Sequence, residues 1–279
     1  MKSAGTITMH TPSTNRVAGR CAWAARRRAL QTIARDTILE ALRGRWLWLA
    51  ASAALLVGAA AIFARSLALT ETHEVTLAFA APIGRLVAVL IVVLTTVASV
   101  VREKSEGTLL LALAAPVSRA SWIAAKALGF ALIATVTAVL LAAPVLAVAP
   151  MPAAAIWTAS LGLELIVLAI VSLAIARVLG QIAPAVSAAI AFYVLARLLH
   201  IVLLLGERAQ SYSDLESLTP FVRLLRLVVP RLDLFTRTDW LLDGAPSWST
   251  LGGIAVQALL YSSLALVAAI IDLRRAPLA

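Results

Sequence analysis

Long apolar stretches separated by polar connections cover most of the chain after residue 45. Each is about twenty residues long or longer, and a helix of that length crosses the ~30 Å hydrocarbon core of a bilayer. The pattern predicts an all-α fold, a polytopic membrane protein with six transmembrane helices. The predicted spans are 46–64, 83–101, 122–148, 156–178, 185–205 and 251–271, and together they make a membrane domain over 46–271.

Two segments precede the first predicted span. Residues 1–28 are rich in Thr, Ser and Gly without periodicity, so we expect a disordered cytosolic tail. Residues 29–44 place apolar side chains on one side of a helix and arginines, including Arg35 and Arg43, on the other. This pattern is typical of an amphipathic helix in the membrane interface, and the alternative is a cytosolic continuation of the first span. Gly44 offers a bend and favours the interfacial helix.

The outer connections carry polar residues and prolines. Residues 65–81 are predicted to form an outer loop, and Arg85 to extend its charged head to the interface. Pro144 is predicted to kink or end the third span near the outer face. The prolines in 150–152 predict a tight turn, and 206–249 form a long outer segment.

Within that outer segment, Thr219 and Pro220 predict the start of a short surface helix, because proline suits the first helical position. Pro230 ends this run. Such a helix either covers the bundle or gates a lateral exit, and both alternatives stay open. Residues 272–279 follow the last span as a short cytosolic tail.

Residues 102–121 form a long charged connection between the second and third spans. Its charged start leads through Gly107 into a short apolar helix over 109–113, which Pro116 stops. Ser118 can cap the next helix, because a serine hydroxyl accepts a hydrogen bond from an unpaired amide one turn on. A short helix held between two spans and flanked by charge is expected to dock a cytosolic partner.

Composition and charge agree with a membrane protein. Hydrophobic residues make up 62% of the chain and charged residues 14%, whereas about a quarter of an average soluble domain is charged. The net charge of +10 would indicate nucleic acid in a soluble protein, but the positive residues cluster beside the spans, so we expect no nucleic-acid partner. The single cysteine, Cys21, excludes an intrachain disulfide.

Lysine and arginine also predict the orientation. Nine of them precede residue 46, and the stretch from 102 to 126 adds four more. The outer segment has five arginines against six carboxylates, so it does not oppose this bias. By the positive-inside rule, both termini and the connections over 102–121 and 180–184 are cytosolic.

Motifs for catalysis are missing from the sequence. It contains no G-x-x-x-x-G-K-[ST] phosphate loop, no H-E-x-x-H, no G-x-S-x-G and no Cys/His cluster with metal-ligand spacing. We therefore expect no catalytic residue, no metal site and no enzymatic activity on this chain.

Glu164 and Arg197 are the clearest ionisable residues inside the predicted spans, and His200 lies one turn beyond Arg197. Glu164 lies 18 residues before a turn near residue 182, and Arg197 lies 15 residues after it. Their depths in an antiparallel hairpin therefore differ by about 4.5 Å, which predicts an ion pair. The alternative is that each reaches the outer interface separately. An ion-coupled carrier usually has more such residues along a path, so that function is weakly supported.

The central connection resembles the signature of ABC-2 type transporter permeases, in which this element follows the second span and contacts the ATPase. The residues that carry the resemblance are Glu103, Glu106, Gly107, Thr108, Leu109, Pro116, Ser118, Arg119 and Lys126. Residues 230–235 are similar to a segment in the branch that includes the nitrous-oxide-reductase maturation permease.

The resemblance implies a permease subunit in a bacterial inner membrane, exporting a cargo or transmitting a mechanical signal. Its partners would be a separate ABC ATPase, which binds ATP and Mg, and a second permease copy or paralogue in the lipid bilayer. No cofactor is implied on this chain. The competing functions are an ion-coupled secondary carrier and a membrane scaffold without transport.

Overall fold

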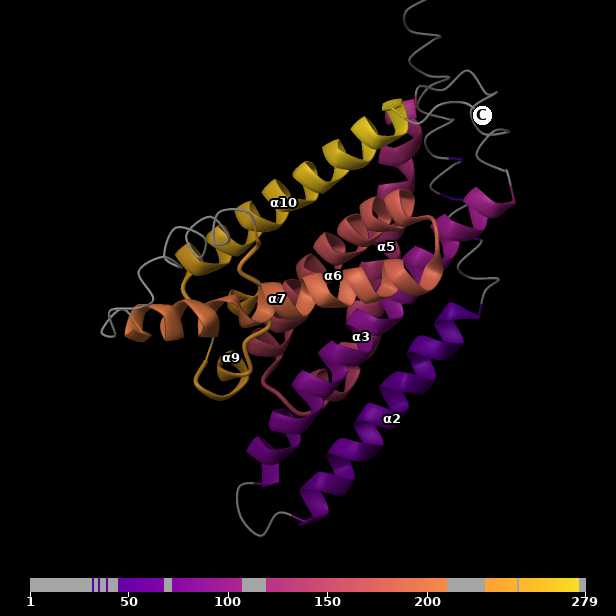
Figure 1. The fold of residues 1–279 in the computed structure, drawn as a ribbon. Coiled ribbons are helices and arrows are strands. Elements are labelled where there is room, and N and C mark those ends of the chain that lie inside the picture. Colours follow the sequence, from indigo (N-terminus) through magenta and orange to yellow (C-terminus); the bar gives the residue numbers. More distant parts are fainter. Residues whose placement is uncertain are drawn as a thin grey trace, which may run out of the picture.

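The computed structural model describes residues 45–67, 72–106, 119–209, 229–244 and 246–275, together with Thr32, Arg35 and Leu39. Side chains are described except at 199–209 and 274–275. Helices make up nearly all of these residues, and no strand occurs among them (Figure 1). The elements are α2 (Trp46–Leu67), α3 (Thr72–Ser105), α5 (Arg119–Leu146), α6 (Met151–Leu179), α7 (Ile182–Ala209), η2 (Leu232–Leu234), α9 (Asp239–Leu242) and α10 (Trp248–Arg275).

Five helices, α2, α3, α5, α6 and α10, are long and apolar enough to cross a membrane. In α7, the part with described side chains, Ile182–Leu198, is apolar but shorter. The fold is therefore that of a multi-pass helical membrane protein, as the apolar pattern predicts, while the sixth span stays a prediction. The predicted interfacial helix over 29–44 also stays a prediction, because only three of its residues are described.

Helix α6 lies at the centre of the bundle, in contact with α3, α5, α7 and α10. Its sequence is apolar on all sides, which is the pattern of a helix surrounded by other helices. Trp157, Leu161, Leu165 and Leu168 are fully buried. The polar side chains that α6 carries are consequently held away from lipid, within the bundle.

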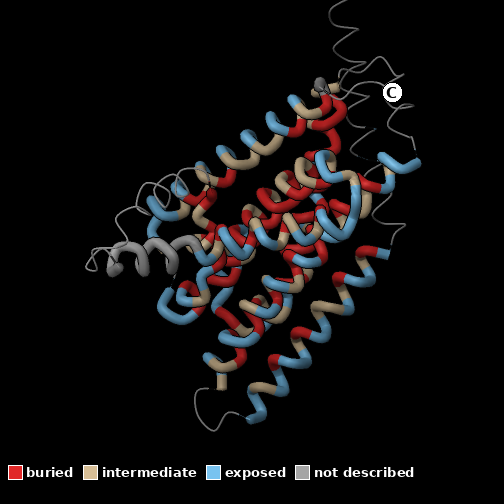
Figure 2. Tube along the Cα trace, in the orientation of Figure 1, coloured by how far each residue is buried: buried red, intermediate tan, exposed pale blue. Residues whose placement is uncertain are grey.

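Helices α2 and α10 lie at the edges. Figure 2 shows exposed residues along much of both helices, whereas α6 is mostly buried. The exposed side chains are large and apolar, among them Leu55 and Phe63 on α2 and Leu259 and Leu264 on α10. Such surfaces suit lipid, which is as apolar as they are.

Helix α3 begins at Thr72, which corrects the predicted outer loop over 65–81. The loop was predicted because this segment carries the polar residues Glu71, His73 and Glu74, which favour a connection over a span. Packing overrides this preference, since Leu77 and Ala81 are buried and α3 contacts α2 and α5. Thr76 Oγ1 also donates to Thr72 O at 2.7 Å.

Other boundaries shift by a few residues. Helix α5 ends at Leu146, close behind Pro144, in line with the predicted end of the span. Helix α6 begins at Met151, so the predicted turn over 150–152 is wrong for its last two residues. Pro152 is tolerated in the first helical turn, where its missing N–H leaves no bond unmade. Helix α10 continues through Arg275, into the predicted tail.

Three predictions fall largely or wholly outside the described residues. The predicted N-terminal tail over 1–28 is one of them. The coupling helix over 109–113, with Gly107 before it, is another. The surface helix that starts at Thr219 and Pro220 is the third.

Candidate functional site

A buried ion pair joins α6 to α7. Arg197 Nη1 lies 3.4 Å from Glu164 Oε1, and the side chain of Glu164 is 0% exposed while that of Arg197 is 20% exposed. The chain reverses at Gly180, whose left-handed backbone (φ 65°) ends α6 and whose N–H donates to Ala176 O at 2.9 Å. This reversal brings the two side chains together, so the structure contains the ion pair that the hairpin geometry predicts.

Arg197 also binds a segment that is distant in sequence. Its Nη1 donates to Leu232 O at 2.5 Å and to Phe235 O at 3.0 Å. Leu232, Phe235 and Thr236 are fully buried, so the 229–236 segment packs inside the bundle. This burial corrects the prediction of a polar outer segment for these residues. Its physical reason is that a buried guanidinium needs acceptors beyond a single carboxylate.

Thr236 connects most of the polar groups. Its Oγ1 donates to Glu164 Oε2 at 2.6 Å and lies 3.4 Å from Arg197 Nη1. Its N–H donates to Ser160 Oγ at 3.1 Å, and its carbonyl accepts from Arg85 Nη1 at 3.1 Å. The φ angle of Thr236 is 45°, a conformation that β-branched residues rarely adopt. The hydrogen bonds therefore hold the segment against its local backbone preference.

Arg85 points into the bundle, which corrects the prediction that it extends to the interface on its own. Its Nη1 bonds Thr236 O, and the residue is half-buried. The reason is that this carbonyl would otherwise be buried without a partner. Tyr193 lies beside Arg85. The two side chains are within hydrogen-bonding reach of each other, and neither the Tyr193 hydroxyl nor Arg85 Nε has a further hydrogen-bond partner among the described residues.

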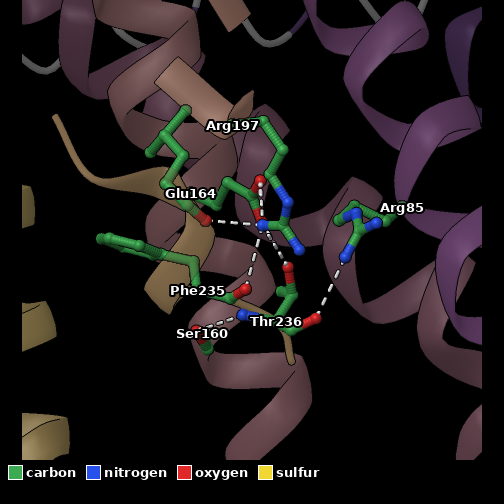
Figure 3. Close-up of polar contacts among 7 residues, drawn as sticks. Arg85, Ser160, Glu164, Arg197, Phe235 and Thr236 are labelled. Atoms are coloured by element: carbon green, nitrogen blue, oxygen red, sulfur yellow. Dashed lines mark hydrogen bonds and ion pairs between the residues drawn. The ribbon is translucent and has the colours of Figure 1, made fainter. Parts of the chain in front are cut away.

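Figure 3 shows the resulting arrangement, with Arg197 between Glu164 and the turn at Thr236, and Arg85 reaching Thr236 from α3. The network joins α3, α6, α7 and the 229–236 segment. Close by, Arg231 Nη2 and Asp233 Oδ2 form a separate ion pair at 3.1 Å. We call the following residues the buried polar cluster: Arg85, Ser160, Glu164, Tyr193, Arg197 and Thr236.

A second group lies at the other end of α3. Glu103 forms an ion pair with Lys126 of α5. Lys126 is buried, and its Nζ lies 5.6 Å from the ring centres of Trp122 and of Phe130, within the range of cation–π attraction. Two of the residues predicted to couple to the ATPase thus bind each other, and Lys126 occupies an internal position.

Three further contacts tie helix ends together here. Lys104 Nζ donates to Arg177 O at 3.4 Å, and Arg177 Nη2 lies 3.3 Å from Asp272 Oδ2. Arg119 Nη1 donates to Leu273 O at 3.0 Å. The ends of α3, α5, α6 and α10 therefore meet on one side of the bundle. We call the following residues the helix-end network: Glu103, Lys104, Arg119, Lys126, Arg177 and Asp272.

The other residues predicted to contact the ATPase are either exposed or lie outside the described part of the chain. Glu106 is exposed at the last turn of α3, where its N–H donates to Arg102 O at 2.9 Å. The residues outside the described part of the chain are Gly107, Thr108, Leu109, Pro116 and Ser118.

Sequence reasoning missed Thr236 and Arg177, whose side-chain partners lie 72 and 95 residues away. Such separations leave no local spacing signal. For Arg177, the available signal was its position on the same predicted side of the membrane as Asp272.

Among the described residues, no group of three or more His, Cys, Asp or Glu side chains is placed to hold a metal ion. No protein-family model matches the chain, and no curated protein matches it.

Proposed function

We propose that this chain is the membrane-spanning permease subunit of an ATP-binding-cassette transporter of the ABC-2 type. The helix-end network is the observation that carries the proposal. Its members Lys104 and Arg119 lie on either side of 107–118 and bind neighbouring helices. A displacement of that connection is therefore passed to α3, α5, α6 and α10 together, through direct contacts.

In this proposal the energy source is a separate ATPase subunit that binds ATP and Mg. The absence of a phosphate loop from the sequence supports this division. Two permeases and two ATPases make the transporter, and ATP shifts the population between two arrangements of the helices. Six spans, the interfacial helix over 29–44 and cytosolic termini in a bacterial inner membrane belong to the same proposal, as does export or mechanical transmission.

An ion-coupled carrier is the second candidate, and the buried carboxylate of Glu164 is the observation that favours it. Its Oε1 is bound by Arg197 and its Oε2 by Thr236. A coupling ion would have to displace these partners. A carboxylate held by an arginine and a hydroxyl fits a structural role better, and this favours the permease.

The topology gives the first test. Ser105 and Ser249 are exposed residues next to opposite ends of the bundle. With Cys21 replaced, Ser249→Cys is expected to react with an impermeant thiol reagent in intact cells, and Ser105→Cys only after the cells are opened. The readout is gel shift of the labelled chain. The reverse pattern would invert the orientation and place the helix-end network outside.

Glu106→Arg tests the coupling directly. Glu106 is exposed, so its reversal is expected to leave folding intact and to weaken association with the ATPase at least about tenfold by opposing a basic partner surface. The measurement is co-purification in detergent with an ABC ATPase of the same organism, together with ATP hydrolysis with and without this chain.

The matched control is Glu74→Arg, the same change at an exposed position in the first turn of α3. It is expected to leave association unchanged. If both variants bound the ATPase equally well, Glu106 would not belong to the surface that docks the ATPase. Failure of the unmodified chain to bind or stimulate any such ATPase would remove the permease function itself.

A further inference from the structure

The 229–236 segment reaches halfway into the membrane domain. Thr236 bonds Ser160 and Glu164, which are the tenth and fourteenth of the 29 residues of α6. At 1.5 Å per residue, the turn at Thr236 therefore lies about 14–20 Å from the Met151 end of α6. That end is opposite the helix-end network, and α10 begins on the same side, since Asp272 near its far end belongs to the network. The segment is consequently a re-entrant element, from which the chain turns back inside the bundle.

Polar side chains of three helices hold the segment in place. Arg197 of α7 and Arg85 of α3 bind its carbonyl oxygens (Figure 3). Ser160 and Glu164 of α6 bind Thr236. Regular structure within the segment is a single 3-10 turn, η2. Irregular backbone is tolerated at membrane depth only where protein or water satisfies its polar groups. The inserted position of the segment therefore depends on these side chains.

Stabilising and strained features are combined in the inserted segment. Leu232 and Phe235 are fully buried, and this burial favours insertion. Thr236 has a φ angle of 45°, which a β-branched residue rarely adopts, and this strain opposes insertion. Strained backbone of this kind persists only where its surroundings fix it, and it is concentrated in active sites, ligand clamps and switch regions. The segment is therefore suited to move as a unit between the helices, which have regular backbone bonds of their own.

Polar groups lie directly behind the segment. Glu164 and Ser160 are 0% and 2% exposed, and both side chains face Thr236. Arg197 lies beside them and faces the segment as well. Ionisable residues at this depth of a membrane domain commonly line the path of a polar substrate or ion. If the segment withdrew, these side chains would face a space that opens toward the Met151 end of α6.

We propose that the 229–236 segment is a gate, which closes this polar interior and opens by withdrawing toward the Met151 end of α6. In the closed state Arg85 and Arg197 bind its carbonyl groups, as in this structure. In the open state the two arginines, Ser160 and Glu164 face the vacated space. The gate is inferred from the fold alone and not from the proposed permease function, because a permease and an ion-coupled carrier both need one.

The test measures how fast single cysteines react in the full chain, in mild detergent and with Cys21 replaced. The reagent is 2-sulfonatoethyl methanethiosulfonate, a small charged thiol reagent. Val229→Cys reports the segment and Ser160→Cys the interior behind it, and we call these two the gate cysteines. Ala134→Cys, the α5 cysteine, reports a fully buried position elsewhere. The gate cysteines are expected to react at similar rates, at least about tenfold faster than the α5 cysteine, because a local opening exposes only the former.

Adding Thr236→Val weakens the closed state, because it keeps the shape of the side chain and removes the hydroxyl that bonds Glu164. This change is expected to raise the rates of both gate cysteines about tenfold and to leave the α5 cysteine unchanged. Thr137→Val is the matched control, since Thr137 is fully buried and its hydroxyl bonds Ile133 O within its own helix. The control is expected to change none of the three rates.

Several results would overturn the gate. Equal rates at the gate cysteines and the α5 cysteine before Thr236→Val is added would show no local opening. Equal acceleration of all three by Thr236→Val, or the same acceleration by Thr137→Val, would show that the whole bundle loosens. Acceleration at Val229→Cys without Ser160→Cys would show a segment that moves without uncovering the interior. Unchanged rates at both gate cysteines would show a fixed structural segment.

Discussion

Glu164→Gln is expected to lower the free energy of unfolding in detergent by about 3 kcal/mol, and Arg197→Gln by a similar amount. The carboxylate of Glu164 is fully buried and accepts from Arg197 and Thr236 at once. The amide of glutamine has one acceptor and one donor, so one of these partners then meets an N–H group. Arg197 is left as a buried cation without a counter-charge.

Unfolding in mixed detergent micelles, followed by tryptophan fluorescence, measures both effects. The double variant is expected to cost less than the sum of the single ones by about 1–2 kcal/mol, because the second substitution removes a charge that the first left unpaired. Glu74→Gln changes an exposed glutamate on α3 and serves as the control. Strictly additive losses would contradict the pairing. Unchanged stability with lost transport would move these residues to a cargo path.

Lys126→Met is expected to cost about 2 kcal/mol of stability and to abolish stimulation of the ATPase. The substitution keeps most of the length of the side chain but removes the ion pair with Glu103. It also removes the cation that lies 5.6 Å from the rings of Trp122 and Phe130. Arg65→Met is the control, since Arg65 is exposed in the last turn of α2 and lies outside the helix-end network.

Adding Glu103→Gln to Lys126→Met separates stability from coupling. The double variant removes both charges of this pair, so most of the lost stability is expected to return. Stimulation of the ATPase is expected to stay lost, because the ion pair no longer holds α3 and α5 at the base of the coupling element. Full recovery of stimulation would show that the pair only stabilises the fold.

The helices and one long-range contact could be predicted because both follow from the lengths of short stretches of the sequence. A run of about twenty apolar residues has few alternatives to a membrane helix. Glu164 and Arg197 flank a short turn, so their heights follow from the rise per residue. The antiparallel arrangement of the two helices then fixes the heights of these side chains relative to each other.

The start of α3 and most of the buried polar cluster could not be predicted. The polar residues Glu71, His73 and Glu74 indicate a loop, and only packing of Leu77 and Ala81 against the bundle makes the segment helical. Thr236 binds Glu164 across 72 residues, in a backbone conformation that threonine rarely adopts. Contacts of this kind depend on the whole topology, and no spacing in the sequence encodes them.

Helix α3 continues without proline or glycine from Arg85 to Ser105, and β-branched residues fill much of this stretch. Because the usual causes of a helix kink are missing from this stretch, it moves as one straight rod. A tilt of about 10° about its Ser105 end moves Arg85 along an arc on the order of 5 Å over ~30 Å of helix. That travel exceeds the 3.1 Å bond from Arg85 to Thr236 O. A tilt of α3 of this size therefore either moves the 229–236 segment with it or breaks the hydrogen bond between Arg85 and Thr236.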